Sequence, residues 1–282
     1  MRDDDFDMAA YLRRIGHAGP VTPDLPVLRA LVCAHAATIP FENIDVLLRR
    51  SIRFDTAAVQ AKLIRGGRGG YCFEQNSLLR AALEAIGFRV TALMARVVRG
   101  QAADAETPRT HMMLRVDLPQ GAFLADVGFG NLTPTGLLAF GVAGAQPTPH
   151  EDFRLTPLGD AVVVEALIGG DWQPLYRVPP DAPPPVDFEV GNWFTSTHLA
   201  SPFTTNLIVA RPVAGVRRTL FNGRYAERAV AGDAVATPVD GVDDLTRRLA
   251  EKFDLVLPSD DVAAVLAAIP AEPAPRFRHF QG

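Results

Sequence analysis

The amino-acid sequence predicts an α+β fold in which helices come first, an antiparallel sheet or barrel follows, and a region of strands and helices ends the chain. Up to residue 87, apolar residues recur at helical spacing. From Phe88 onward, short segments rich in β-forming residues alternate with turn residues. The 282 residues are enough to bury a sizeable core. We therefore expect a helical domain at 1–87, a β domain at 88–190 and an α/β domain at 191–282.

Two helices are expected before the glycine-rich segment. In TPDLPVLRALVCAHA (22–36), Thr22 is the expected N-cap and Pro23 the expected first helical residue. In FDTAAVQAKLIRGG (54–67), Asp55 is the expected cap and Gly66 the expected end.

Five segments after residue 87 predict the antiparallel strands. They are FRVTALMARVV, THMMLRVDL, AFLADVGF, DAVVVEAL and WQPLYRV, and the proline-rich VPPDAPPPVDF (178–188) ends the series. Further strands are expected in PFTTNLIVAR and RRTLF. Apolar residues four apart in DDLTRRLAEKF predict a helix at 243–253, and Ser259 is the expected cap of a last helix.

Composition excludes several classes of function. The net charge is −4 and no run of Lys or Arg is present, so no nucleic-acid partner is expected. The acidic start argues against a signal peptide, and the glycines and prolines of 127–150 argue against a membrane span. Two cysteines cannot make a disulfide framework, which favours a reducing cytoplasm. No CxxC or HExxH motif is present, so we expect no metal.

The two cysteines occupy different settings. Cys33 lies in an apolar helical pattern, where a cysteine is usually a small buried hydrophobe. Cys72 stands between a double glycine and a helix expected to begin near Phe73 and end at Gly87. A helix N-terminus stabilises an anion, so this position favours a reactive thiolate at Cys72. The glycines of RGGRGG (65–70) could instead suggest a phosphate-binding loop, but no Gly-Lys-Ser/Thr follows them and no strand precedes them. We therefore expect them to shape the turn at Cys72.

A nucleophilic thiol needs a base, and His111 is the histidine that the strand pattern selects. In HMMLRVDL the even positions are apolar, which places His111 on the opposite face. LPQG (118–121) predicts a hairpin, and if Asp117 pairs with Ala122, Asp126 becomes a diagonal neighbour of His111 on one face. Cys72, His111 and Asp126 would then form a Cys–His–Asp triad for thiol acyl transfer.

Five motifs in this order identify a resemblance. They are YLRRIG (11–16), IPFENID (39–45), RGGYCFEQN (68–76), ADVGFG (125–130) and SPFTTN (201–206). The sequence resembles the arylamine N-acetyltransferases over most of its length. That resemblance implies an N-terminal helical bundle, a β-barrel and a C-terminal α/β lid, in a fold related to papain-like thiol enzymes. It also implies acetyl-CoA as donor, Cys72 as acetyl carrier, His111 as base and Asp126 as orienter.

The implied reaction is a ping-pong acetyl transfer to arylamines, arylhydrazines or N-hydroxyarylamines, as in xenobiotic metabolism. For the flat acceptor we consider aromatic residues near the motifs, with core packing as the alternative role for each. Thr110 resembles a family position near the donor. The candidate substrate-binding residues are therefore Phe41, Tyr71, Thr110, Phe129 and Phe203.

Two departures from the family pattern lie in the expected lid. HLASPF lacks the proline that often follows the histidine, and Asp254 stands where glycine is commoner. Neither departure touches the triad, so both bear on the identity of the acceptor more than on the reaction. Arg217 and Arg218 are candidates for contacts with the phosphates of coenzyme A, with surface solvation as the alternative.

Three other functions remain open from the sequence. An amide synthase of the same fold would close macrolactams from carrier-bound polyketides. A thiol hydrolase or transglutaminase-like enzyme would admit water or another acceptor to the acyl-enzyme. A small-molecule binding protein would have no use for an aligned triad.

Overall fold

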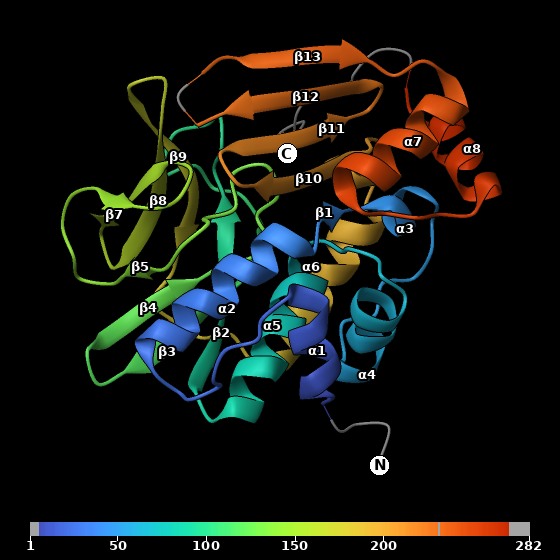
Figure 1. Cartoon of the computed structure of the whole chain (residues 1–282). Helices are drawn as coiled ribbons and strands as arrows, with labels where there is room; N and C mark the ends of the chain where they lie inside the picture. Colours follow the sequence, from blue (N-terminus) through green and yellow to red (C-terminus); the bar gives the residue numbers. More distant parts are fainter. Residues whose placement is uncertain (1–5, 231, 271–282) are drawn as a thin grey trace.

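The computed structural model describes residues 6–230 and 232–270, and the chain folds into helices, an eight-stranded sheet and a five-stranded sheet (Figure 1). The α+β fold class predicted from the sequence is confirmed. In the view of Figure 1 the helices of the first third of the chain lie below the five-stranded sheet, and together they contact strands of both sheets.

The N-terminal helices are largely where the sequence predicts them. They are α1 (Met8–Ile15), α2 (Leu25–Thr38), α3 (Ile44–Leu47), α4 (Thr56–Val59), the π-helical η1 (Gln60–Arg65) and α5 (Cys72–Ile86). Asp55 caps α4 by accepting a hydrogen bond from the Ala58 N–H, and Gly66 follows the last residue of η1. Gly87 ends α5 with a left-handed φ of 103°.

The expected start of α2 was wrong. Asp24, not Thr22, is the N-cap, and its carboxylate accepts from the Val27 N–H at 3.0 Å. The Thr22 hydroxyl donates to that carboxylate at 2.6 Å, so it supports the cap from outside the helix. Pro26, rather than Pro23, is the proline of the first turn.

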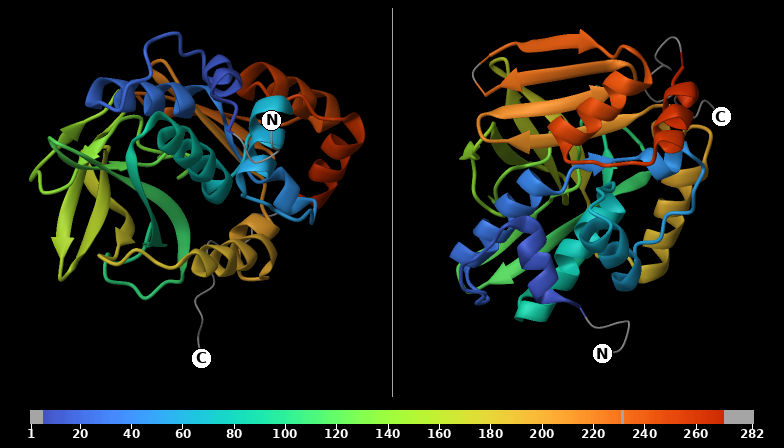
Figure 2. Two further views of the ribbon diagram at one scale, coloured as in Figure 1. Left: turned by 90° about the horizontal axis from the view of Figure 1, so that it is seen from below. Right: turned by 45° about the vertical axis from the view of Figure 1, so that its right-hand side comes forward.

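The eight-stranded sheet is antiparallel throughout and curves around an interior (Figure 2). The strands of this sheet are β2 (Arg89–Val97), β3 (Arg109–Leu118), β4 (Gly121–Ala125), β5 (Leu138–Ala139), β6 (Gln146–Pro147), β7 (Asp152–Leu158), β8 (Ala161–Ile168) and β9 (Asp171–Val178). Their order in the sheet is β5-β4-β3-β2-β9-β8-β7-β6, and β5 also contacts β7. The sequence did not predict β7, whose segment DFRLTPL mixes charges with a proline.

The second sheet joins distant parts of the sequence. Its strands are β1 (Phe41–Glu42), β10 (Ile208–Val213), β11 (Val216–Phe221), β12 (Arg224–Ala229) and β13 (Ala234–Pro238). Their order in the sheet is β1-β10-β11-β12-β13, and β1 pairs antiparallel with β10. An N-terminal segment is thus built into the C-terminal sheet, and the three-way domain division stays a prediction.

The C-terminal helices partly match expectation. In α7 (Gly241–Phe253), Leu245, Leu249 and Phe253 are buried as their spacing predicts. The last helix, α8 (Ser259–Ala268), has Pro258 rather than Ser259 as its cap. The sequence did not predict β12 and β13, the last two strands of the second sheet. It also did not predict α6 (Pro185–Thr197), which begins within the proline-rich segment. A short 3₁₀ turn, η2 (Pro202–Thr204), follows α6.

Asp254, the departure noted in the sequence, ends α7. Its backbone is left-handed with φ at 58°, a conformation that glycine adopts most readily and that Asp tolerates better than most residues. The aspartate therefore fills a helix-terminating role, and its carboxylate lies 3.6 Å from Arg14.

The two faces of β3 enter different cores. Met112, Leu114 and Val116 pack with α5, while Met113 joins the interior of the eight-stranded sheet. This alternation, predicted from the sequence, directs His111 to the interior face. None of the helices in the described part of the chain has the length and apolar character needed to cross a membrane.

Candidate active site

Cys72 is the first residue of α5, and Tyr71 is the N-cap. The side chain of Cys72 is buried, and its Sγ lies 3.6 Å from the carbonyl oxygen of Thr110. The Tyr71 N–H donates to Glu74 Oε2 at 3.1 Å, so the third helical residue closes the first turn. The thiol therefore lies where unpaired N–H groups make the local potential positive.

Three glycines allow the chain to pack closely around this turn. A Cβ at Gly69 would lie 2.1 Å from the Pro40 carbonyl oxygen, and one at Gly70 would lie 2.7 Å from Glu74 Oε2. From the other side, a Cβ at Gly128 would lie 2.7 Å from the Cys72 Cα. The double glycine thus serves close backbone packing around the nucleophile's turn.

His111 and Asp126 form a buried pair. Nε2 of His111 lies 2.7 Å from Oδ2 of Asp126, and their side chains are 3 % and 0 % exposed. The predicted pairing of Asp117 with Ala122 is confirmed, but the ladder ends where Leu114 pairs with Ala125. The expected continuation of this strand to Phe129 was therefore wrong, and Asp126 reaches His111 from the turn that follows β4.

Three further groups hold the Asp126 carboxylate. The Tyr176 hydroxyl donates to Oδ2 at 2.9 Å, while Asn76 Nδ2 at 3.1 Å and the Gly128 N–H at 2.9 Å donate to Oδ1. Asn76 also accepts from the Val127 N–H at 3.1 Å, which fixes the orientation of its amide. Every oxygen of the buried carboxylate is thus hydrogen-bonded.

Asn76 and Tyr176 were not among the site residues predicted from the sequence. Asn76 was detectable, because it follows Cys72 by four residues and so shares its helix face. Tyr176 had no local signal. It comes to the site only because β9 pairs with β2 across a long sequence separation.

The electrostatics of the pair favour its ionic form. Burial alone lowers the pKa of His111, but the charge of Asp126, its hydrogen bond and the nearby Cys72 together raise that pKa to about 10. Burial raises the pKa of Asp126, but the imidazolium charge and the hydrogen bonds outweigh it and leave the pKa lowered. Because Nε2 is bonded to Asp126, Nδ1 is the nitrogen left to face Cys72.

Phe129 lies beside the pair. Its ring centroid is 5.0 Å from that of His111 in an edge-to-face arrangement and 4.8 Å from that of Tyr176. Its side chain is partly exposed. The chain turns after β4, as it must for this residue to face the histidine, so Phe129 can present an aromatic surface at the site.

The other aromatic candidates form a cluster. The Phe203 ring is 6.0 Å from both Phe41 and Tyr71, and only Phe203 is partly exposed. The Tyr71 hydroxyl donates to Asn192 Oδ1. Core packing thus accounts for the contacts of Phe41 and Tyr71.

Thr110 borders a cavity of about 260 Å³ next to the carbonyl that faces Cys72. Residues of β2, β3 and α6 line it, together with Pro108. The other lining residues are Met94, Pro108, Arg109, Asp187, Val190, Gly191 and Phe194.

The two arginines predicted as candidates for phosphate contacts lie in different settings. Arg217 is buried and bonded to Glu151 and to the carbonyl oxygens of residues 131 and 133. Arg218 donates to the Lys252 carbonyl oxygen at 3.2 Å. The buried Arg217 guanidinium is therefore a poor candidate for a phosphate contact. The Arg218 side chain is 26 % exposed, and its phosphate contact stays a prediction.

No cluster of three or more metal-ligating side chains occurs within 6–230 and 232–270. Cys33, the second cysteine, lies outside the site. Its Sγ donates to the Thr135 carbonyl oxygen at 3.0 Å, and burial raises the pKa of its thiol.

Comparison with known proteins matches residues 24–262 to a family described as N-acetyltransferase. An arylamine N-acetyltransferase of Mycolicibacterium smegmatis is 45 % identical over 209 residues, covering 73 % of this chain and 76 % of that protein. The arylamine N-acetyltransferase / N-hydroxyarylamine O-acetyltransferase of Salmonella typhimurium is 36 % identical and covers 94 % and 96 % of the two chains.

Solved structures agree with the sequence matches. The Mycobacterium marinum arylamine N-acetyltransferase in complex with CoA has a TM-score of 0.88 and 35 % identity, covering 93 % of this chain and all of that one (100 %). The Salmonella typhimurium enzyme has the same TM-score, 0.88, at 35 % identity, covering 93 % and 98 %.

Proposed function

This chain belongs to the arylamine N-acetyltransferase family, and on that premise we propose that it moves an acetyl group from acetyl-CoA to an aromatic amine through a thioester on Cys72. The observation that carries the proposal is the buried His111–Asp126 pair, 2.7 Å between Nε2 and Oδ2, beside a thiol at a helix N-terminus. A binding protein would gain nothing from such an aligned pair.

In the first half-reaction the Cys72 thiolate attacks the thioester carbonyl of acetyl-CoA. The new S–C bond forms, the bond to the coenzyme A sulfur breaks, and the His111 imidazolium gives its proton to the departing thiolate. One thioester replaces another, so the step is near thermoneutral and the acetyl group stays reactive.

In the second half-reaction a neutral arylamine attacks the acetyl-Cys72 carbonyl. His111, now neutral, takes the amine proton as the C–N bond forms, and Cys72 leaves as thiolate. The imidazolium–thiolate pair is thereby restored. His111 gives one proton in the first half-reaction and takes one in the second, which is the proton balance that a ping-pong cycle requires.

Asp126 is the proposed orienter. Its carboxylate holds the Nε2 proton of His111 and stabilises the imidazolium, while Tyr176 and Asn76 fix the carboxylate. Asn76 acts on the histidine through Asp126, whereas the Tyr176 ring also lies against the imidazole, with centroids 4.8 Å apart. We regard both as positioning residues.

For the acceptor, Phe129 is the best supported contact, because it is partly exposed and lies against the histidine ring. Arylamines, arylhydrazines and N-hydroxyarylamines share a flat ring that such a surface can stack on. Phe203 and Thr110, both partly exposed, are the next candidates. The free thiols of both cysteines fit a reducing cytoplasm.

Single-turnover kinetics test the proposal. Enzyme acetylated by acetyl-CoA and freed of donor should lose its acetyl group to an arylamine much faster than to water. Transfer to water at least as fast as to any arylamine would favour the thiol-hydrolase alternative.

A further inference from the structure

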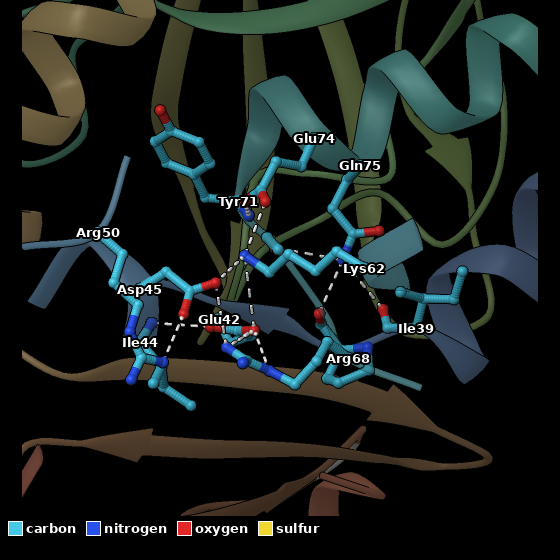
Figure 3. A network of polar contacts seen from close by, with 12 residues as sticks. Ile39, Glu42, Ile44, Asp45, Arg50, Lys62, Arg68, Tyr71, Glu74 and Gln75 are labelled. Carbon is cyan, nitrogen blue, oxygen red and sulfur yellow. Dashed lines mark hydrogen bonds and ion pairs between the residues drawn. The ribbon is translucent and has the colours of Figure 1, made fainter. Parts of the chain in front are cut away.

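A buried ionic network lies beneath the turn that carries Cys72 (Figure 3). Lys62, on the π-helical segment η1, is its centre. Nζ of Lys62 lies 2.7 Å from Asp45 Oδ2, 2.7 Å from Glu74 Oε1 and 3.9 Å from Glu42 Oε1. One ammonium group therefore joins carboxylates from β1, α3 and α5. π-Helical turns are rare and often mark functional sites.

The charges of the network are closely balanced. Three carboxylates face Lys62 and Arg68, whose guanidinium lies 2.7 Å from Glu42 and 3.5 Å from Asp45. Arg50 also contacts Asp45 but is 46 % exposed at its side chain. Carboxylates at this depth are costly without a cation, so loss of Lys62 would leave them undercompensated.

Glu74 is the carboxylate that depends most on Lys62. Its burial and the charge of Glu42 raise the pKa of Glu74 to about 7 even though the Lys62 charge acts to lower it. Glu42 and Asp45 have Arg68 as a second cation, whereas Lys62 is the only cation among the described residues that forms an ion pair with Glu74.

Glu74 connects the network to the nucleophile. While Oε1 accepts from Lys62, Oε2 accepts from the Tyr71 N–H at 3.1 Å, directly before Cys72. Gly70 lets this carboxylate pack on the turn, since a Cβ there would meet it at 2.7 Å. A change at Lys62 therefore reaches the cysteine through one side chain and one backbone hydrogen bond.

We propose that Lys62 is a positioning residue for acetyl transfer: by neutralising Glu74 and tying α5 to β1 and α3, it holds the turn at 70–72 so that Cys72 faces His111. The inference rests on the proposed function. Lys62 touches neither the thiol nor the histidine, and its effect passes through Glu74. A displacement of the turn by about 1 Å is enough to slow a reaction up to about 100-fold.

The test compares variants that remove the positive charge of Lys62, keep it, or remove it together with the negative charge of Glu74. Lys62→Met removes the ammonium at similar length, and Lys62→Arg keeps the charge. Lys62→Met/Glu74→Gln also removes the carboxylate but retains an amide oxygen for the Tyr71 N–H. Arg154→Met is the control, because it breaks an ion pair with Glu165 on neighbouring strands outside the network.

Each variant is measured at a temperature where circular dichroism shows it folded. The readouts are the rate of CoA release in a single acetylation, the KM for acetyl-CoA, and the pH profile of Cys72 alkylation by iodoacetamide. Lys62→Met should acetylate about 10–100-fold more slowly with little change in KM, and its alkylation profile should move to higher pH. The double variant should recover part of both losses, Lys62→Arg should lie closer to wild type, and Arg154→Met should match it.

Wild-type acetylation and alkylation in folded Lys62→Met would overturn the proposal, even if its melting temperature falls. If Lys62→Met does not fold, Glu74→Gln decides: it breaks the pair from the other side and should slow acetylation several-fold, and wild-type rates there would overturn the proposal equally. A wild type that alkylates at Cys72 but takes no acetyl from acetyl-CoA would instead refute the proposed function, while the alkylation profiles still test Lys62.

Discussion

Tyr176 and His111 bind the same oxygen of Asp126: the tyrosine hydroxyl lies 2.9 Å and the imidazole Nε2 2.7 Å from Oδ2. The carboxylate is fully buried and its other oxygen is held by Asn76 and the Gly128 N–H. A carboxylate fixed in this way can hold only one orientation of the imidazole. This arrangement makes the dependence of activity on Asp126 testable.

Asp126→Asn should retain the fold but lose acetyl transfer by roughly 10³–10⁴-fold, the scale found for other orienting carboxylates. The neutral amide no longer raises the pKa of His111, so imidazolium should no longer support the thiolate near neutral pH. Alkylation of Cys72 by iodoacetamide should then rise only above about pH 7, whereas we expect the wild type to react already at pH 6.

The control for that experiment is Asp117→Asn, on the same hairpin but bonded to Arg115 at the surface. It should behave as wild type. An alkylation profile that Asp126→Asn leaves unchanged would mean that the carboxylate has only a structural role.

The raised pKa of His111 predicts a specific dependence of stability on pH. The folded value is about 10 and the ordinary value about 6.5, so His111 stabilises the fold fully below about pH 6.5. This contribution is lost as the pH rises through about 10. The advantage in unfolding free energy of wild type over His111→Gln, measured by urea titration, should therefore shrink between pH 7 and 10. An advantage that stays constant or grows over this range would contradict a charged His111.

Gly128→Ala should displace the nucleophile. The new methyl would lie 2.7 Å from the Cys72 Cα and 2.8 Å from Asn76 Nδ2, which is closer than real Cβ contacts allow. We expect at least a tenfold fall in the rate of Cys72 acetylation, since shifts of about 1 Å carry losses of up to about 100-fold. Gly223→Ala is the matched control, because a Cβ there meets nothing within 4 Å. Equal acetylation rates in the two variants would show that the contact at Gly128 is unimportant.

Phe129→Ala should affect the second half-reaction more than the first. One aromatic contact contributes about 0.5–1.5 kcal/mol in addition to the burial of apolar area, so its loss should lower kcat/KM for the amine several-fold. Acetylation of Cys72 needs only the thiol and the thioester and should change much less. Stopped-flow measurement with pre-acetylated enzyme isolates the amine step. A wild-type rate of transfer to arylamines would assign Phe129 to the core instead.

The sequence predicted what local patterns encode. Alternation in β3 and the Leu118–Gly121 hairpin predicted that His111 and Asp126 meet, although Asp126 does so from the turn after β4 rather than from the strand. The helix at Cys72 follows from its glycines and apolar spacing. The same local logic failed where a segment carries mixed signals, as in β7 and in α6 after its prolines. Tertiary contacts decide those elements rather than local propensity.

The parts that escaped prediction depend on distant segments. Tyr176 reaches the site only through the pairing of β9 with β2. Lys62 meets its carboxylates only after β1, α3 and α5 pack against η1. Arg217 is a residue whose role the sequence overestimated. Its place in the C-terminal part of the chain favoured a phosphate contact, but the side chain is buried against Glu151 by packing that no local pattern reveals.

Mass spectrometry of the intact protein, after mixing with acetyl-CoA and no acceptor, tests the central claim most directly. We predict one acetyl group per chain, mapped by peptide analysis to Cys72 and lost on addition of an arylamine. Cys33→Ala should acquire the same acetyl group, whereas Cys72→Ala should acquire none and should not transfer acetyl above the uncatalysed rate. No acetylation of the wild type, an acetyl group on another residue, or clear turnover by Cys72→Ala would contradict the account.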